Sequence, residues 1–141
     1  MEAVTAQTQA TVLLVSEDQS LREQLSDLLE EDGDYVLLCP GTQAGRDACL
    51  GLQGYPCALE RGVTLVVVDL LMDGVSPATG RLASLVGRYR AGGRAVLALV
   101  DDHDRLRVSE SLERLGVTVG SRSDPRDTIV QTSRELLAVN A

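Results

Sequence analysis

Residues 65–74 read LVVVDLLMDG, in which four apolar residues run directly into an aspartate. A short apolar run rich in β-branched residues is typical of a strand that is buried on both faces, as in the centre of a parallel sheet. Such a strand delivers its last residue, Asp69, to the carboxyl edge of the sheet, where open α/β sheets bind their ligands. The stretch therefore predicts a central parallel strand and makes Asp69 the first candidate for a functional residue.

Strand-like and helix-like patterns alternate along the whole chain. We expect strands at residues 11–15, 35–39, 65–69, 95–100 and 117–121. We expect helices from Ser20, where Glu23 completes a capping box, at 42–53, after Ser76-Pro77, at 108–115 and after Asp124-Pro125. Strands that alternate with helices pair in parallel through right-handed crossovers. The pattern predicts an α/β, flavodoxin-like, doubly wound sheet of five parallel strands in the order 2-1-3-4-5, with five helices.

Length and composition limit the classes of function. The 141 residues suit a flexible N-terminal tail over residues 1–10 and one domain over residues 11–141. The formal net charge of -8 argues against direct binding to nucleic acid, and no apolar run reaches the roughly 18 residues of a membrane span. Three cysteines without metal-ligand spacing suit a reducing compartment. We therefore expect a cytoplasmic protein that binds neither nucleic acid nor membrane.

Two acids are predicted to meet at the carboxyl edge of the sheet. In the order 2-1-3-4-5 the strands at 11–15 and 65–69 are neighbours, so Glu17 and Asp69 would follow adjacent strand ends. Mg²⁺ in proteins is typically held by one or two carboxylates together with several waters. This pair is therefore a candidate Mg²⁺ site.

From residue 11 to residue 139 the chain resembles the receiver domains of two-component response regulators. Residues 12–18, VLLVSED, are similar to the family's first strand and acidic pocket, and residues 69–74, DLLMDG, are similar to the end of its phosphoacceptor strand. The resemblance implies that Asp69 accepts a phosphoryl group from a histidine kinase. It also implies that Glu17, Asp69 and the backbone carbonyl of Leu71 hold Mg²⁺, and that the protein is a signalling module, not an enzyme.

The family's pattern is degraded at four pocket positions, which are Ser16, Val100, Arg122 and Asp124. Ser16 stands where the family has one of two adjacent acids, Val100 where it has a hydroxyl, and Asp124 where it has the lysine of a Lys-Pro pair. The chain contains no lysine at all, so Arg122 is the nearest candidate for the missing cation. Losing an acid weakens the affinity for Mg²⁺, and Asp124 would repel a phosphoryl group. Asp124 is also explained as an N-cap before Pro125, without any functional role.

We therefore expect a receiver-type signalling module with a degraded phosphorylation pocket that holds Mg²⁺ weakly and acts mainly through protein–protein contacts. Its expected partner is a signalling protein, with a histidine kinase as the first candidate, and a homodimer is compatible with the sequence. The alternative is a Mg²⁺-dependent response regulator that is phosphorylated on Asp69. A flavodoxin-like or nucleotide-binding protein is a third interpretation, but neither a G-x-G-x-x-G nor a Walker A motif is present.

The same departures predict a strained charge at Asp69. With no lysine to neutralise two neighbouring carboxylates, and with Arg122 reaching only part of the way, repulsion and burial would disfavour the ionised form. On this interpretation the substitution Asp69→Asn relieves the site and raises stability at neutral pH.

Overall fold

The computed structural model describes residues 10–16, 18–39, 62–70 and 80–139. Its strands are β1 (Thr11–Val15), β2 (Tyr35–Cys39), β3 (Leu65–Asp69), β4 (Ala95–Val100) and β5 (Thr118–Ser121). Its helices are α1 (Gln19–Glu31), α2 (Gly80–Ala91), α3 (Asp102–Arg114) and α4 (Arg126–Val139). Outside residues 40–61, which are not described and separate β2 from β3, strands and helices alternate as the sequence predicted. None of the helices in these ranges is long and apolar enough to cross a membrane.

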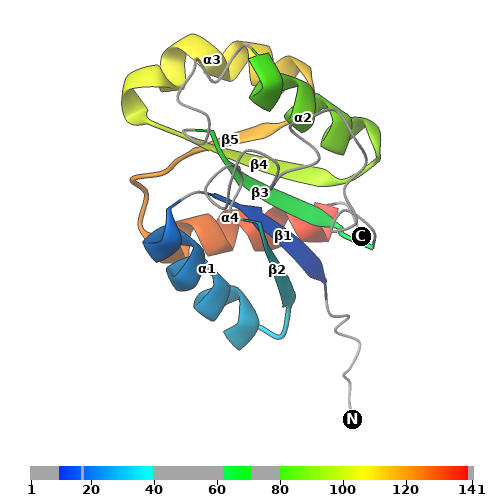
Figure 1. The fold of residues 1–141 in the computed structure, drawn as a ribbon, viewed down its shortest axis with the longest axis vertical. Coiled ribbons are helices and arrows are strands. Elements are labelled where there is room, and N and C mark those ends of the chain that lie inside the picture. Colours follow the sequence, from blue (N-terminus) through cyan, green and yellow to red (C-terminus); the bar gives the residue numbers. More distant parts are fainter. Residues whose placement is uncertain (1–9, 17, 40–61, 71–79, 140–141) are drawn as a thin grey trace.

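The five strands form one sheet in the order β2-β1-β3-β4-β5, and every neighbouring pair is parallel. The predicted fold class and strand order are confirmed. β3 lies at the centre of the sheet, and all five of its residues are buried (Figure 1). Because all strands run in the same direction, their carboxyl ends lie at one edge, and Asp69 ends the central strand there.

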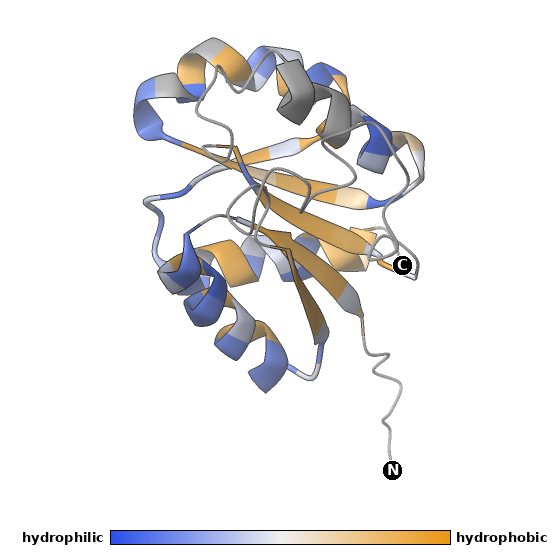
Figure 2. Cartoon of the chain, in the orientation of Figure 1, coloured by the Kyte–Doolittle hydropathy of each residue, from blue (hydrophilic) through white to orange (hydrophobic). Residues whose placement is uncertain are grey.

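Helices cover both faces of the sheet. α1 and α4 lie on one face, and α2 and α3 lie on the other (Figure 1). Successive strand side chains point to opposite faces, so Val12 and Leu14 pack with the apolar side chains of α1 and α4, while Leu13 and Val15 pack on the side of α2 and α3. Figure 2 shows the resulting hydrophobic sheet between helices whose outer faces are polar. Each fully buried leucine contributes about 1.5–3 kcal/mol to folding.

The start of α1 differs from the prediction. The capping box of Ser20 and Glu23 is wrong, because α1 begins at Gln19 and its N-cap is Asp18. The Asp18 carboxylate accepts a hydrogen bond from the Leu21 backbone N–H at 3.2 Å, whereas the Ser20 hydroxyl accepts one from the Gln24 side chain. Asp18 has the extended backbone of an N-cap. Its short side chain places the carboxylate at the Leu21 backbone N–H, which has no partner within the helix because it belongs to the first turn.

Several expectations lie outside the described residues. These are the tail, of which only Ala10 is described, the helix at 42–53, and the helix start at Ser76-Pro77. Three of the five expected helices fall within the described ranges and are observed, as α1, α3 and α4, and the expected helix after Ser76-Pro77 is described from Gly80 onwards, as α2.

Candidate functional site

Strand register brings the candidate residues together at the carboxyl edge. β1 and β3 pair with Val15 opposite Val68, so the next residues, Ser16 and Asp69, lie side by side. β4 and β5 pair with Val100 opposite Ser121, and the backbone N–H of the following residue, Arg122, donates to the Val100 carbonyl at 2.9 Å. The edge thus gathers residues from β1, β3, β4 and β5 that are far apart in the sequence.

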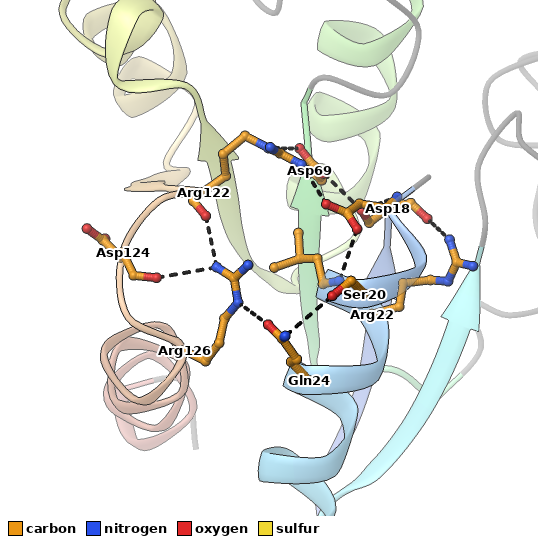
Figure 3. Close-up of polar contacts among 10 residues, drawn as sticks. Asp18, Ser20, Arg22, Gln24, Asp69, Arg122, Asp124 and Arg126 are labelled. Atoms are coloured by element: carbon orange, nitrogen blue, oxygen red, sulfur yellow. Dashed lines mark hydrogen bonds and ion pairs between the residues drawn. The ribbon is translucent and has the colours of Figure 1, made fainter.

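The centre of the site is an ion pair between Asp69 and Arg122 (Figure 3). Arg122 Nε donates to Asp69 Oδ1 at 3.1 Å, and Arg122 Nη2 donates to Asp69 Oδ2 at 2.9 Å. The Ser16 hydroxyl donates to Asp69 Oδ2 at 2.8 Å. The Asp69 side chain is only 3% exposed, while that of Arg122 is 23% exposed. A planar guanidinium therefore grips both oxygens of a buried carboxylate, which is the strongest geometry for such a pair.

This geometry corrects the expected charge balance. Arg122 does not reach part of the way towards Asp69 but forms a two-point ion pair with it. The hydrogen bond to Asp69 is the main cause that raises the pKa of Arg122 above its usual value, so the pair favours the charged guanidinium. The reasoning that Asp69→Asn would relieve strain loses its basis, because the cation thought to be missing is present.

Asp18 extends the charge network. Its Oδ2 lies 3.4 Å from Arg122 Nη2, and its backbone N–H donates to the Ser16 hydroxyl at 3.0 Å. The hydrogen bond from the Leu21 backbone, followed among the lowering causes by the charge of Arg122, holds the pKa of the Asp18 carboxyl below its usual value. The Ser16 hydroxyl therefore accepts a hydrogen bond from the Asp18 backbone and donates one to the Asp69 carboxylate. An ionised aspartate at position 16 could not take this role, because it has no proton to donate.

A buried hydroxyl is present one strand away from the expected position. Val100 is fully buried and has no hydroxyl, as its identity required. Ser121, opposite it on β5, is also buried and donates to Asp102 Oδ1 at 2.5 Å while accepting from the Ser123 backbone N–H at 3.1 Å. Sequence reasoning missed this residue. The available signal was a hydroxyl as the last residue of a predicted strand.

Asp124 has a different local role from the one predicted. Its carboxylate accepts a hydrogen bond from the Ser121 backbone N–H at 3.2 Å, three residues before it. The predicted N-cap before Pro125 is therefore wrong, because the carboxylate closes the connection between β5 and α4 instead. It is Arg122, not position 124, that approaches Asp69.

The structure describes only part of the predicted Mg²⁺ site. The predicted ligands Glu17 and Leu71 lie outside the described residues, which leaves Asp69 of the predicted set. Both oxygens of Asp69 accept hydrogen bonds from a guanidinium, whose positive charge repels a metal cation. Within the described ranges no three His, Cys, Asp or Glu side chains gather in a way that could hold a metal ion.

No protein-family model and no curated protein sequence matches this chain. Solved structures match it over nearly its full length. A response regulator receiver domain protein from Clostridium thermocellum is 14% identical with a TM-score of 0.67, and the alignment covers 92% of this chain and 95% of that one. A CheY-like receiver domain protein from Methanospirillum hungatei JF-1 is 12% identical with a TM-score of 0.69, covering 94% and 97%.

An adenylate cyclase from Rhodopirellula baltica is 19% identical with a TM-score of 0.67, covering 94% of this chain and 90% of that one. At such identities the comparisons establish the fold and not the chemistry of the site. The chain has the CheY-like receiver fold.

Proposed function

We propose that this chain, whose fold is that of response regulator receiver domains, is a signalling module that works through protein–protein contacts and does not depend on phosphorylation of Asp69. The observation that carries the proposal is the ion pair between Asp69 and Arg122. Both Asp69 oxygens accept hydrogen bonds from the same guanidinium, and the side chain is 3% exposed.

The chemistry of phosphoryl transfer explains why this pair matters. An aspartate accepts a phosphoryl group when one oxygen is free to attack and a metal ion neutralises the transferring group. At Asp69 each oxygen accepts a hydrogen bond from Arg122, so the neighbouring cation is an arginine and not a metal ion. Removing Arg122 from Asp69 would take an ion-pair partner away from a buried carboxylate, which is strongly unfavourable. The pair therefore supports a module whose phosphorylation pocket stays closed, in the sense that Arg122 remains bound to Asp69 and Asp69 accepts no phosphoryl group.

The proposed partner is another signalling protein, with a histidine kinase as the first candidate and a second copy of the chain as the other. The net charge of -8 argues against nucleic acid as the direct partner. We further propose that the role is not enzymatic and that the protein works in the cytoplasm, since its three cysteines lack metal-ligand spacing and suit a reducing compartment.

A second candidate function is a Mg²⁺-dependent phosphoacceptor. One observation favours it: Asp69 ends the central strand with a cation directly against it. The resemblance to receiver domains implies a cation that neutralises a phosphoryl oxygen at this place. On this reading Arg122 would release the carboxylate and then bind the phosphoryl group.

A phosphodonor experiment separates the two functions. The purified protein is incubated with Mg²⁺ and acetyl phosphate, and its intact mass is measured, with Asp69→Asn as the matched control. The proposed function predicts the same mass before and after incubation in both proteins. A phosphoryl adduct on the unmodified protein that is absent from Asp69→Asn would establish the second function instead.

An in-cell complementation assay adds the biological test. Asp69→Asn should retain signalling when its cellular level matches that of the unmodified protein, whereas a phosphate-driven regulator would lose its output. Abundance has to be measured in the same cells, because the substitution also weakens the ion pair.

A further inference from the structure

Arg126 makes a set of contacts that helix stability does not explain. It is the first residue of α4, where the positive end of the helix dipole disfavours a cation. Its side chain nevertheless turns back to the preceding loop, and Nη1 donates to the Arg122 carbonyl at 2.9 Å and to the Asp124 carbonyl at 3.3 Å. Figure 3 shows this guanidinium between the loop and α1.

The contacts of Arg126 hold the backbone of Arg122. The Arg122 backbone N–H donates to the Val100 carbonyl at 2.9 Å, and its carbonyl accepts from Arg126. Both polar backbone groups of Arg122 are therefore occupied. Holding an arginine side chain in one geometry costs rotamer entropy. A backbone that is already fixed reduces the free energy that is needed to keep the Arg122 guanidinium on Asp69.

Arg126 is also attached to α1. Its Nε donates to Gln24 Oε1 at 2.8 Å, and the Gln24 amide donates to the Ser20 hydroxyl at 3.3 Å. The loop that carries Arg122 is thus tied to a helix on the same face of the sheet, from a part of the sequence about a hundred residues away. These outer contacts are exposed, so their contribution to overall stability is small.

We infer that Arg126 is a positioning residue: together with Gln24 it holds the β5–α4 connection so that the Arg122 guanidinium stays on Asp69. The inference rests on the proposed function, in which that ion pair keeps the pocket closed. It adds that Arg122 is kept on Asp69 by residues outside the pocket, through the contact of Arg126 on α4 with Gln24 on α1.

The test uses Arg126→Ala with Arg134→Ala as the matched control. Arg134 is also an α4 arginine, bound to the carboxylate of Asp32, the residue that caps the end of α1. It lies eight residues further along and has no described contact with the Arg122 loop. The measured quantity is the hydrogen-exchange rate of the Arg122 Nε proton, followed by NMR. This proton donates to Asp69 Oδ1, so its exchange reports opening of the ion pair.

We expect exchange to become about tenfold faster in Arg126→Ala, as the loss of about one hydrogen bond's net free energy implies. Arg134→Ala should leave the rate unchanged. Arg126→Lys, which can still donate to the loop carbonyls, should restore most of the protection. If Arg126→Ala fails to fold, Gln24→Ala takes its place and should change the rate in the same direction.

Two results would overturn the inference in distinguishable ways. Equal rates in the unmodified protein and Arg126→Ala, or equal acceleration in Arg126→Ala and Arg134→Ala, would show that Arg126 does not position Arg122. An Arg122 Nε proton that is already unprotected in the unmodified protein would show that the ion pair itself does not form, and the proposed function would fail with it.

Discussion

The guanidinium of Arg122 binds the carboxylate of Asp69 at two points, with Nε 3.1 Å from Oδ1 and Nη2 2.9 Å from Oδ2. The two residues are 53 positions apart and reach each other because β5 and β3 end at the same edge of the sheet. A buried carboxylate needs such a partner, since its unpaired charge would be highly unfavourable in the interior. The pair is therefore a structural requirement, and in it both oxygens of Asp69 accept hydrogen bonds from Arg122.

Asp69→Asn should lower stability. The substitution removes one charge of the pair and leaves the half-buried guanidinium of Arg122 without its main partner. We expect the free energy of unfolding to fall by about 1–3 kcal/mol, measured from the denaturant midpoint at unchanged m-value. Asp27→Asn, at an exposed acid on α1, is the control and should be close to neutral. A more stable Asp69→Asn protein would restore the interpretation of Asp69 as a strained charge.

Arg122→Met should be more damaging than Asp69→Asn. Methionine keeps much of the side-chain volume but leaves the Asp69 carboxylate buried without a cation, which should cost about 3 kcal/mol. In the double variant the Asp69 charge is gone as well, so the two losses should not add. The sum of the two single losses should exceed the loss in the double variant by about 1–3 kcal/mol. Losses that simply add would mean that the two side chains do not interact in solution.

Asp18→Ala should destabilise the protein by about 1 kcal/mol, because it removes the acceptor for the Leu21 backbone N–H at the start of α1. Ser20→Ala is the matched comparison two residues away, and its loss should stay within about 0.5 kcal/mol because its described side-chain contact is exposed. Thermal or chemical unfolding of both variants decides which residue caps the helix. A larger loss in Ser20→Ala would reinstate the capping box.

Asp34→Asn should change how stability depends on pH. Burial raises the pKa of the Asp34 carboxyl above its usual value, so the folded protein holds this proton more tightly than the unfolded chain does. Stability is then full below the unfolded pKa of about 4 and decreases as the pH rises through the folded pKa. Asp34→Asn should consequently be more stable than the unmodified protein at neutral pH, and this gain should vanish in acid. Unfolding midpoints across the pH range test it, and a gain that persists below both pKa values would contradict it.

The sheet was predictable because its signal is local and strong. The apolar runs that became β1, β3 and β4 are buried on both faces, and a continuous apolar run is the pattern that such burial requires. The alternation with helices then allowed few topologies, and the order β2-β1-β3-β4-β5 was among them. Asp69 was identified as a strand-end acid for the same reason.

The partners of Asp69 were less predictable because they depend on the path of a loop. The contacts of Val100 and Arg126 with the Arg122 backbone decide whether its guanidinium binds both oxygens of Asp69. The sequence does not reveal these contacts. The helix start was missed because Asp18 and Ser20 are both good N-cap residues, and backbone geometry decides between them. Ser121 was overlooked because the hydroxyl was sought at position 100, one strand away.

The most direct test of the central claim is an NMR titration of the unmodified protein with Mg²⁺ and beryllofluoride, observed at the Arg122 Nε–H signal. This signal reports the bond to Asp69 Oδ1, which a phosphoryl mimic on the carboxylate would have to replace. If the ion pair keeps the pocket closed, the signal stays at the same chemical shift throughout the titration. A saturable shift of the Arg122 signal that requires both Mg²⁺ and beryllofluoride, and that is absent in Asp69→Asn, would contradict the account and identify Asp69 as a working phosphoacceptor.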